Sequence, residues 1–255
     1  MANDICGILR ANAYPGRGLI LGVGGDGTTG IMVYFIMGRS ENSRNRIFAK
    51  TDDGFRTEAF DPAKLTDPSL VIYNPLRVIE NAAVITNGDQ TETIVDHINA
   101  DRAFRERENR QGVSPQNDSI RKAFHTALMT REFEPDPPIY TPRISGLVRA
   151  DGGYTLSILK SAEGNPECCC RYFYDYSSAR PGLGHFISTY MADGAPPPSY
   201  EGEPRQVKMD VSRGLEVFAE EIWDALDANN KVSLYVRETE ITTGKFSDLI
   251  INKNE

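Results

Sequence analysis

The order in which strand and helix patterns alternate along the chain is the sequence feature that most constrains its fold. Two amphipathic helical patterns lie next to each other, over residues 91–104 and 118–131, and a third follows over residues 215–226. Blocks of β-branched and aromatic residues precede, separate and follow these helices. This order predicts an α+β fold with helices packed outside antiparallel sheets, and it disfavours a doubly wound α/β fold.

The strand blocks contain one loop that matches a nucleotide-binding fingerprint. Gly22, Gly24 and Gly27 have the spacing of the dinucleotide motif, but β-branched and aromatic residues follow in place of a helix, so we interpret the loop as a hairpin turn. The predicted strands cover residues 19–23, 31–37, 46–50, 70–73, 83–86, 144–149, 154–159, 169–174, 185–190, 207–209, 232–236 and 246–251. The segment 105–116 is expected to be a solvated loop.

Charge and hydropathy exclude two classes of partner. The 255 residues carry 36 acidic and 28 basic side chains, for a formal net charge of -8, which argues against a nucleic-acid backbone as the main partner. The longest apolar run, residues 31–37, is far shorter than the roughly 18 to 20 residues of a membrane helix, and the N-terminus does not resemble a secretory signal, so we expect a cytoplasmic protein. Local charge leaves a small anion possible, because arginine outnumbers lysine by seven to two in the first 80 residues.

Cysteines and histidines give no metal or disulfide pattern. Cys168, Cys169 and Cys170 are consecutive, so in a strand they point to alternate faces, and the three histidines are scattered singly. We expect no metal and no disulfide framework. Cys6 would become an N-terminal nucleophile only after removal of five residues, which leaves a processed amidohydrolase as one alternative.

Six short strings occur in an order that resembles the archaeal-type IMP cyclohydrolase family. They are 13–17 (AYPGR), 34–46 with its Gly38-Arg39-Ser40 and Asn45-Arg46, 72–74 (IYN), 86–88 (TNG), 141–144 (TPRI) and 184–190 (GHFISTY). The likeness covers residues 14–190 and is weaker over 191–255. The chain departs from the family pattern by about two extra residues between Ser40 and Asn45, by a long loop over 105–116 and by an extended C-terminal part.

The resemblance implies both a fold and a reaction. The fold is a four-layer αββα sandwich of two mostly antiparallel sheets, like that of the N-terminal nucleophile hydrolases but without a self-processing nucleophile, formed by residues 1–255 as a single domain. The reaction is closure of 5-formamidoimidazole-4-carboxamide ribonucleotide to IMP with loss of water in purine synthesis. The resemblance implies no cofactor, and a sandwich with sheet edges to protect suggests a homo-oligomer.

The matched strings supply candidate site residues. We expect Arg39, Tyr73 and Glu134 to be catalytic: Arg39 stabilises charge, Tyr73 stacks on the heterocycle or donates to the formyl oxygen, and Glu134 transfers the amide proton. The candidate substrate-binding residues are Arg17, Arg46, Asn74, Asn87, Gly88, Thr141, Arg143 and His185.

Each candidate type suits part of the substrate. Guanidinium groups match phosphate oxygens, side-chain amides can pair with a carboxamide, and Gly88 lets the backbone approach a ligand. His185 is a second candidate acid or base. Two alternatives stay open beside the cyclohydrolase: a purine-nucleotide-binding protein without turnover, and a related cyclohydrolase or amidohydrolase that acts on a similar ribonucleotide.

Overall fold

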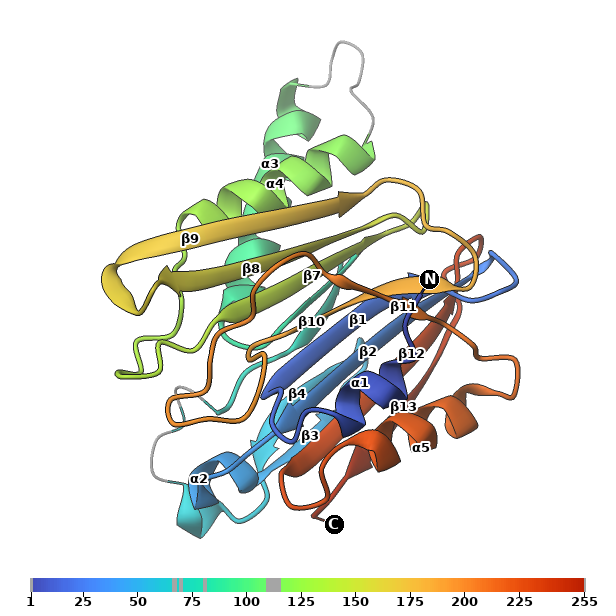
Figure 1. The fold of residues 1–255 in the computed structure, drawn as a ribbon. Helices are drawn as coiled ribbons and strands as arrows, with labels where there is room; N and C mark the ends of the chain where they lie inside the picture. Colours follow the sequence, from blue (N-terminus) through green and yellow to red (C-terminus); the bar gives the residue numbers. More distant parts are fainter. Residues whose placement is uncertain (1, 66–67, 69–70, 80–81, 109–115, 255) are drawn as a thin grey trace.

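A computed structural model describes residues 2–65, 68, 71–79, 82–108 and 116–254 of the chain. It contains two main antiparallel sheets and a small two-stranded one (Figure 1). The six-stranded sheet has the order β11-β10-β1-β2-β12-β13, and the five-stranded sheet has the order β5-β6-β7-β8-β9. All strand pairs within these sheets are antiparallel.

The elements have the following bounds. The six-stranded sheet consists of β1 (Arg17–Val23), β2 (Thr29–Met37), β10 (Leu183–Ser188), β11 (Arg205–Lys208), β12 (Lys231–Glu240) and β13 (Phe246–Asn252). The five-stranded sheet consists of β5 (Leu76–Ile79), β6 (Ala82–Thr86), β7 (Arg143–Arg149), β8 (Tyr154–Ala162) and β9 (Asn165–Tyr176), and β3 (Arg46–Lys50) pairs with β4 (Phe55–Ala59). The helices are α1 (Ile5–Arg10), α2 (Glu41–Arg44), α3 (Gln90–Glu108), α4 (Gln116–Met129) and α5 (Leu215–Ala225).

Three apolar clusters stack these elements into layers. Along β1, Ile20 faces α1 and α5, whereas Leu19 and Leu21 face the five-stranded sheet, as expected when successive side chains point to opposite faces. On the far side of that sheet, Leu147 of β7 packs with Phe124 of α4. The layers are therefore helix, sheet, sheet and helix, with the central cluster between the two sheets (Figure 1).

Most of the predicted elements are confirmed, and the α+β class with mostly antiparallel sheets is correct. The strand predicted over 70–73 is wrong from Val71 to Tyr73, and residue 70 lies outside the described residues; the strand there is Leu76–Ile79. The segment 71–73 is instead held to β4 by individual hydrogen bonds: Thr57 Oγ1 donates to the carbonyl of Val71 and accepts from the amide of Tyr73.

Other boundaries also differ from the sequence interpretation. Helix α3 extends to Glu108, so residues 105–108 are helical and not loop, and 109–115 lie outside the described residues. An ion pair between Arg105 and Asp101, one turn apart, supports this extension. Helix α1 was not predicted, although Asp4 caps it by accepting from the amides of Cys6 and Gly7. No helix in the described part of the chain has the length and apolarity needed to cross a membrane.

Candidate functional site

Most of the sequence-predicted residues gather at one end of the interface between the two sheets. Arg17 is the first residue of β1 in the six-stranded sheet, and Arg143 is the first residue of β7 in the five-stranded sheet. Glu134 lies in the connection between α4 and β7, and Gly88 lies in the connection between β6 and α3. The site therefore forms where strand ends of both sheets meet.

A buried carboxyl group and a largely buried guanidinium group form the centre of this site. Arg17 Nη2 lies 4.0 Å from Glu134 Oε2, and Glu134 is 3% exposed. Burial raises the pKa of Glu134 above its usual value, and Arg17 and Arg143 offset part of that rise. Burial alone would lower the pKa of Arg17, but Glu134 and nearby tyrosines hold it above its ordinary value. Glu134 is thus a carboxyl group that takes up a proton more readily than an exposed one.

Arg46 is the second buried cation of the site, and it lacks a full set of partners. Its side chain is 1% exposed, and its Nε donates to the carbonyl of Ser43 at 2.8 Å. Within the described residues, Nη1 and Nη2 of Arg46 have no hydrogen-bond acceptor, and neither does Nε of Arg17. Burial, followed by the charge of Arg17, lowers the pKa of Arg46. Unpaired buried N–H groups are costly, so this corner of the site is suited to an oxygen-rich ligand group.

Two tyrosines adjoin the arginines. The hydroxyl oxygens of Tyr34 and Tyr73 lie 2.9 Å apart, and both rings are buried. Burial, with a further contribution from Tyr73, raises the pKa of Tyr34 well above its usual value. Tyr34 therefore stays protonated, and it can orient the hydroxyl of Tyr73 toward the guanidinium groups of Arg17 and Arg46, whose charges both interact with Tyr73.

Thr141 belongs to a short chain of polar groups behind Glu134. Its hydroxyl donates to Asp136 Oδ2 at 2.5 Å and lies 2.8 Å from the hydroxyl of Tyr190. Since Thr141 donates to the carboxylate, its oxygen is free to accept the proton of Tyr190. The amide of Glu134 donates to the carbonyl of Thr141 at 2.9 Å, so the same residue also anchors the backbone of the catalytic candidate.

Gly88 sits directly against Arg143 at the start of α3. A Cβ atom at this glycine would lie 2.6 Å from Arg143 Nη1 and 2.7 Å from Gln90 Oε1, so a larger residue would displace the arginine. Arg143 Nη1 donates to Gln90 Oε1 and Asp89 Oδ1, each at 2.6 Å. Burial would raise the pKa of Asp89, but Arg131 and Arg143 lower it, so one carboxylate serves two arginines.

Asn87 has a structural role that the sequence did not indicate. Its Oδ1 accepts from the amide of Ile144 and from Gln90 Nε2, both at 2.9 Å, and its Nδ2 donates to the carbonyl of Pro142 at 2.9 Å. The amide thus ties β7 to the start of α3, and its bonds are occupied by the protein itself.

Three other predicted residues lie away from the Arg17–Glu134 pair. Arg39 donates to Asp193 Oδ1 at 2.7 Å and covers the ring of Tyr14, which stacks on Tyr190, so it is at the rim. Asn74 donates to Glu92 Oε1 on α3.

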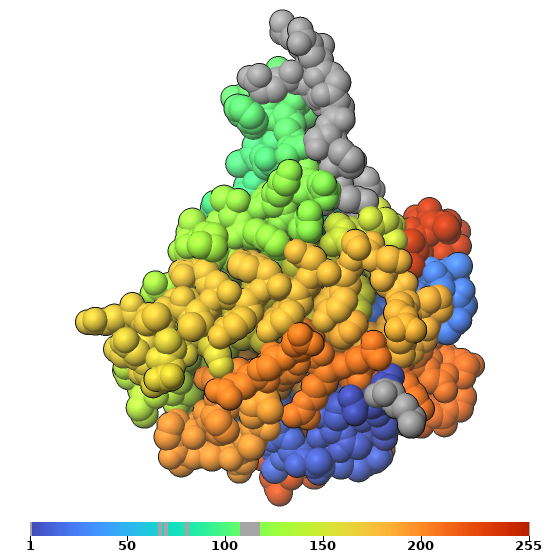
Figure 2. Space-filling view, turned by 45° about the horizontal axis from the view of Figure 1, so that its top comes forward, coloured from blue at the N-terminus to red at the C-terminus, as the bar shows by residue number. Residues whose placement is uncertain are grey.

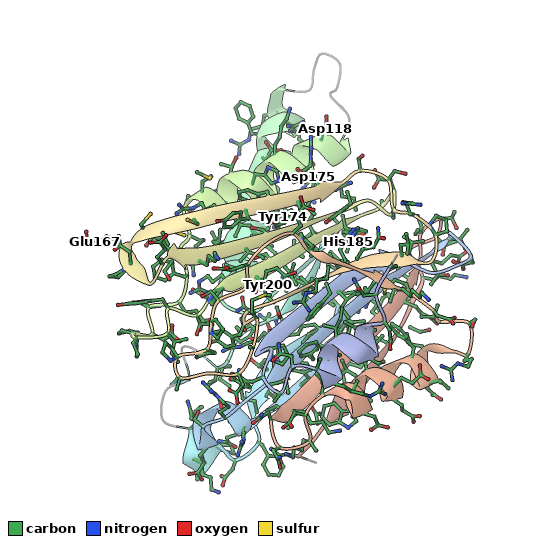
Figure 3. All side chains as sticks on the ribbon, viewed as in Figure 1. Asp118, Glu167, Tyr174, Asp175, His185 and Tyr200 are labelled. Atoms are coloured by element: carbon green, nitrogen blue, oxygen red, sulfur yellow. The ribbon has the colours of Figure 1, made fainter. Side chains whose placement is uncertain are left out.

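His185 lies farther along the sheet interface (Figure 3). It pairs with Leu21, four residues beyond Arg17 on β1, which corresponds to about 13 Å along the strand. Its ring stacks on Tyr176 and its Nδ1 lies 2.7 Å from the hydroxyl of Tyr154. Burial lowers its pKa, so His185 forms a neutral contact between the sheets.

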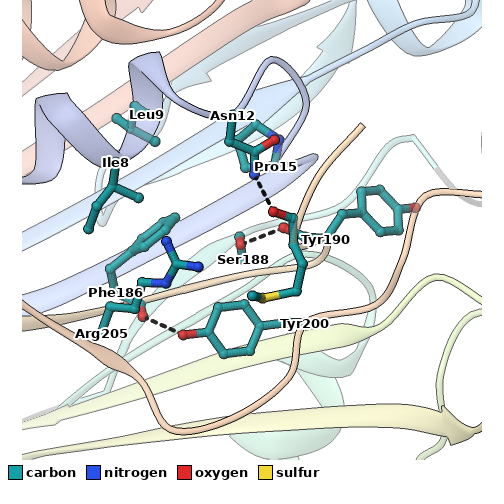
Figure 4. Close-up of a pocket in the computed structure, with 10 residues that line it drawn as sticks. Ile8, Leu9, Asn12, Pro15, Phe186, Ser188, Tyr190, Tyr200 and Arg205 are labelled. Atoms are coloured by element: carbon teal, nitrogen blue, oxygen red, sulfur yellow. Dashed lines mark hydrogen bonds between the residues drawn. The ribbon is translucent and has the colours of Figure 1, made fainter. Parts of the chain in front are cut away.

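Two hollows occur elsewhere on the described surface. A cavity of about 10 Å³ lies between α1 and β10, and the ring of Tyr190 points away from it (Figure 4). A larger hollow of about 510 Å³ lies at the opposite end of β1, beside Asp26 and Asp210. Neither includes Arg17, Arg46 or Glu134.

Sequence reasoning missed several members of the site. Tyr34 occupies a continuous buried strand and Tyr14 precedes a strand, so both resemble core residues in the sequence, and Asp136 resembles a solvated acid in a proline-rich loop. One signal in the sequence could have identified the three tyrosines as site residues: Tyr14, Tyr34 and Tyr190 all occur within the short strings that indicated the site.

Comparison with known proteins identifies the family of the chain. A family model described as IMP cyclohydrolase-like protein matches residues 14–109 and 114–244, a range that includes every residue of the site. The chain belongs to the IMP cyclohydrolase-like family.

A curated relative of this family is similar over most of the chain. The protein named IMP cyclohydrolase from Methanopyrus kandleri is 33% identical over 177 residues, which cover 69% of this chain and 75% of the relative. The membership predicted from the ordered strings is therefore confirmed.

Proposed function

We propose that this chain is an IMP cyclohydrolase, which closes 5-formamidoimidazole-4-carboxamide ribonucleotide to IMP with loss of water in purine biosynthesis. The observation that carries the proposal is the buried Glu134 carboxyl group beside Arg17, next to the unpaired Nη atoms of Arg46. In a member of the IMP cyclohydrolase-like family, this is the combination of acid, base and oxyanion donors that the ring closure needs.

The chemistry requires two proton transfers around one new carbon–nitrogen bond. The carboxamide nitrogen attacks the formyl carbon and loses one proton, and the formyl oxygen becomes a hydroxyl group. That hydroxyl then leaves with a proton as water, while the former formamide nitrogen gives up its own proton and the C=N bond of the purine forms. An amide nitrogen is a poor nucleophile, so positioning the two groups contributes much of the acceleration.

The site residues divide these tasks. Glu134 accepts the proton of the attacking nitrogen and delivers it to the formyl oxygen. It then passes the proton of the former formamide nitrogen to the departing hydroxyl, a role that suits a carboxyl group whose pKa is raised by burial. Arg46 and Arg17 supply N–H donors for the negative charge that develops on the formyl oxygen, and Tyr73, oriented by Tyr34, adds a hydroxyl donor. The reverse reaction hydrolyses a cyclic amidine C–N bond, which places the enzyme among the hydrolases.

The phosphate of the substrate binds at the more open side of the site in this proposal. Arg131 and Arg143 share the single carboxylate of Asp89 beside the first turn of α3. Arg143 also interacts with Glu134, which is already paired with Arg17, so three arginines share two carboxylates in these pairs and positive charge is in excess. A helix N-terminus adds to the attraction for an anion. Arg39 contributes from the rim, where Asp193 holds it beside Tyr14.

Other expectations from the sequence belong to the same proposal. One domain over residues 1–255 is supported by a site that takes residues from both sheets, and the helix-sheet-sheet-helix layering supports a likeness to the N-terminal nucleophile hydrolases. The absence of a cofactor, a cytoplasmic location and the absence of a nucleic-acid partner are expectations from composition and resemblance. Cys6 gives the amidohydrolase alternative no support, because its thiol donates to the carbonyl of Glu221 and its pKa is raised by burial.

The experiment is to supply purified protein with the formamide ribonucleotide and to follow IMP by absorbance and chromatography. We expect turnover without added metal or cofactor. Tyr73→Phe is expected to lower kcat by about 100-fold and leave KM nearly unchanged, because the ring stays while one donor is lost. Tyr174→Phe is the matched control, since that hydroxyl donates to the carbonyl of Gly202 away from the site.

The outcomes separate the two readings of the site. Binding of IMP by calorimetry without any turnover would identify a nucleotide-binding protein. Neither binding nor turnover would overturn the assignment of the site to a purine ribonucleotide.

A further inference from the structure

Strand β9 is an unusually open edge of the five-stranded sheet. It has twelve residues, and its backbone pairs only with β8 among the described residues. No residue of β9 is fully buried, although the strand carries Phe173 and three tyrosines, whereas most of β8 is buried. The side chain of Tyr172 is 41% exposed. In the space-filling view the strand forms a continuous band across the surface (Figure 2).

The other sheet edges in the described structure are short or covered. Strands β5 and β11 have four residues each, and Asn3 forms a bridge with Val207 on β11. The edge of β13 is tied to β3, because Asn252 accepts from the amide of Phe48 and donates to its carbonyl. Long, exposed and apolar edges invite pairing with another strand, so β9 is the edge where a partner is expected.

The charges of β9 indicate what kind of strand would pair with it. From Cys169 to Tyr176 the strand pairs residue by residue with β8, so its side chains alternate regularly. Arg171, Phe173 and Asp175 point to the α4 side. Arg171 donates to the carbonyls of Leu128, Cys169 and Arg131, and Asp175 accepts from Arg121 and from Thr155 Oγ1. If a twofold axis passes between the Phe173 residues of two antiparallel copies, Arg171 of one copy lies opposite Asp175 of the other. This face of the strand is therefore complementary in charge to a second copy of itself.

We propose that β9 pairs with β9 of a second copy of this chain, antiparallel about that axis. Arg171 of each copy then lies opposite Asp175 of the other, and the two Phe173 rings meet between these charge pairs. Registers centred on Arg171 or on Asp175 would instead place like charges directly opposite each other, which is unfavourable. On the other face, Tyr172 lies opposite Tyr174, and the two five-stranded sheets become one sheet of ten strands.

The first test is the mass of the full-length protein in solution, measured by light scattering and sedimentation. Wild type is expected to have at least twice the 28.3 kDa of one chain. Tyr172→Asp puts a carboxylate against the apolar ring of Tyr174 of the other copy, so it should halve the mass. Phe104→Asp is the matched control, because Phe104 is an exposed aromatic residue on α3 and should leave the mass unchanged.

The second test determines the register by disulfide trapping, and it does not depend on catalysis. All four cysteines are replaced by serine, and the oxidant diamide is added to Phe173→Cys, or to Tyr172→Cys combined with Tyr174→Cys. Directly opposite side chains have Cβ atoms about 5 Å apart, so covalent dimers are expected from both variants. A variant that keeps Cys169 alone should give none, because residue 177 lies opposite it.

These outcomes bear on the interface alone. A monomeric wild type, an unchanged mass in Tyr172→Asp, or trapping by Cys169 in preference to the two designed variants would overturn the pairing. Loss of turnover in a correctly dimeric protein would instead count against the proposed function.

Discussion

At the scale of single residues, the buried arginines Arg237 and Arg46 differ in the acceptors that their guanidinium groups have. Arg237 is buried beside Asp248, to which its Nη2 donates at 3.0 Å, and that pair joins β12 to β13. Arg46 is equally buried, but two of its nitrogens have no acceptor in the described structure. A buried guanidinium group whose nitrogens lack acceptors costs stability, so its presence indicates a group that is positioned for a ligand.

This contrast predicts opposite effects of the same substitution. Arg46→Met removes an unpaired buried charge and keeps the side-chain volume, so the free energy of unfolding should rise by about 1 kcal/mol while turnover is lost. Among the described residues, Arg237→Met leaves the buried Asp248 with the exposed Lys50 as its one cationic partner, so stability should fall by about 3 kcal/mol. Urea denaturation measures both. A loss of stability in Arg46→Met would show that this arginine is structural.

Glu134 gives a prediction about pH. Its pKa is raised by burial from the usual 4.5, so the carboxylate that acts as base is formed only as the pH rises above that value. The rate should therefore increase with pH along an acid limb whose midpoint exceeds 4.5. Glu134→Gln should lower kcat by about 1000-fold and remove this limb. Glu132→Gln, an exposed neighbour, should leave both unchanged; an acid limb that survives in Glu134→Gln would assign it to another group.

At the scale of elements, the site depends on how strands and helices begin. Arg17, Arg46 and Arg143 are each the first residue of a strand, and Gly88 precedes the first turn of α3. Sequence patterns predict strands well where β-branched and aromatic residues are frequent, as in β7 and β8, which are both buried over most of their length. The sequence patterns missed the short strands β4 and β5. They also could not indicate that the side-chain hydrogen bonds of Asn87 join β7 to α3.

The close packing at the junction between β6 and α3 predicts how one added methyl group at Gly88 changes activity. Gly88→Ala would place a Cβ atom within 2.7 Å of Arg143 and Gln90, so the arginine must move away from the site. We expect kcat/KM to fall by about 10- to 100-fold with little loss of stability. Gly25→Ala is the matched control, because no atom lies within 4 Å of its Cβ position, and steady-state kinetics with thermal denaturation separates the two. Equal activity in both variants would mean that Arg143 is not needed.

At the scale of the whole molecule, the distance between the two sheets sets the geometry of the site. Arg17 and Tyr34 come from the six-stranded sheet, and Glu134 and Arg143 come from the five-stranded sheet or its connections. The order of elements predicted helices outside antiparallel sheets, and the family resemblance implied two packed sheets. The matched strings supplied residues from both. Neither could give the spacing, because it depends on side chains that meet across the interface and have no relation to one another in the sequence.

The contact between Gly146 of β7 and β1 tests that dependence. A Cβ atom at Gly146 would lie 2.9 Å from side-chain atoms of both Leu19 and Leu21, so Gly146→Ala should push the sheets apart, cost about 1 to 2 kcal/mol and lower kcat several-fold without touching the site. Leu21→Val relieves one of these two close contacts and leaves the one with Leu19, so the double variant should recover part of both quantities, and a double-mutant cycle measures the coupling. If Gly146→Ala loses stability yet keeps its full kcat, the arrangement of Arg17 and Glu134 is set within the strand ends themselves, and the spacing of the sheets serves stability alone.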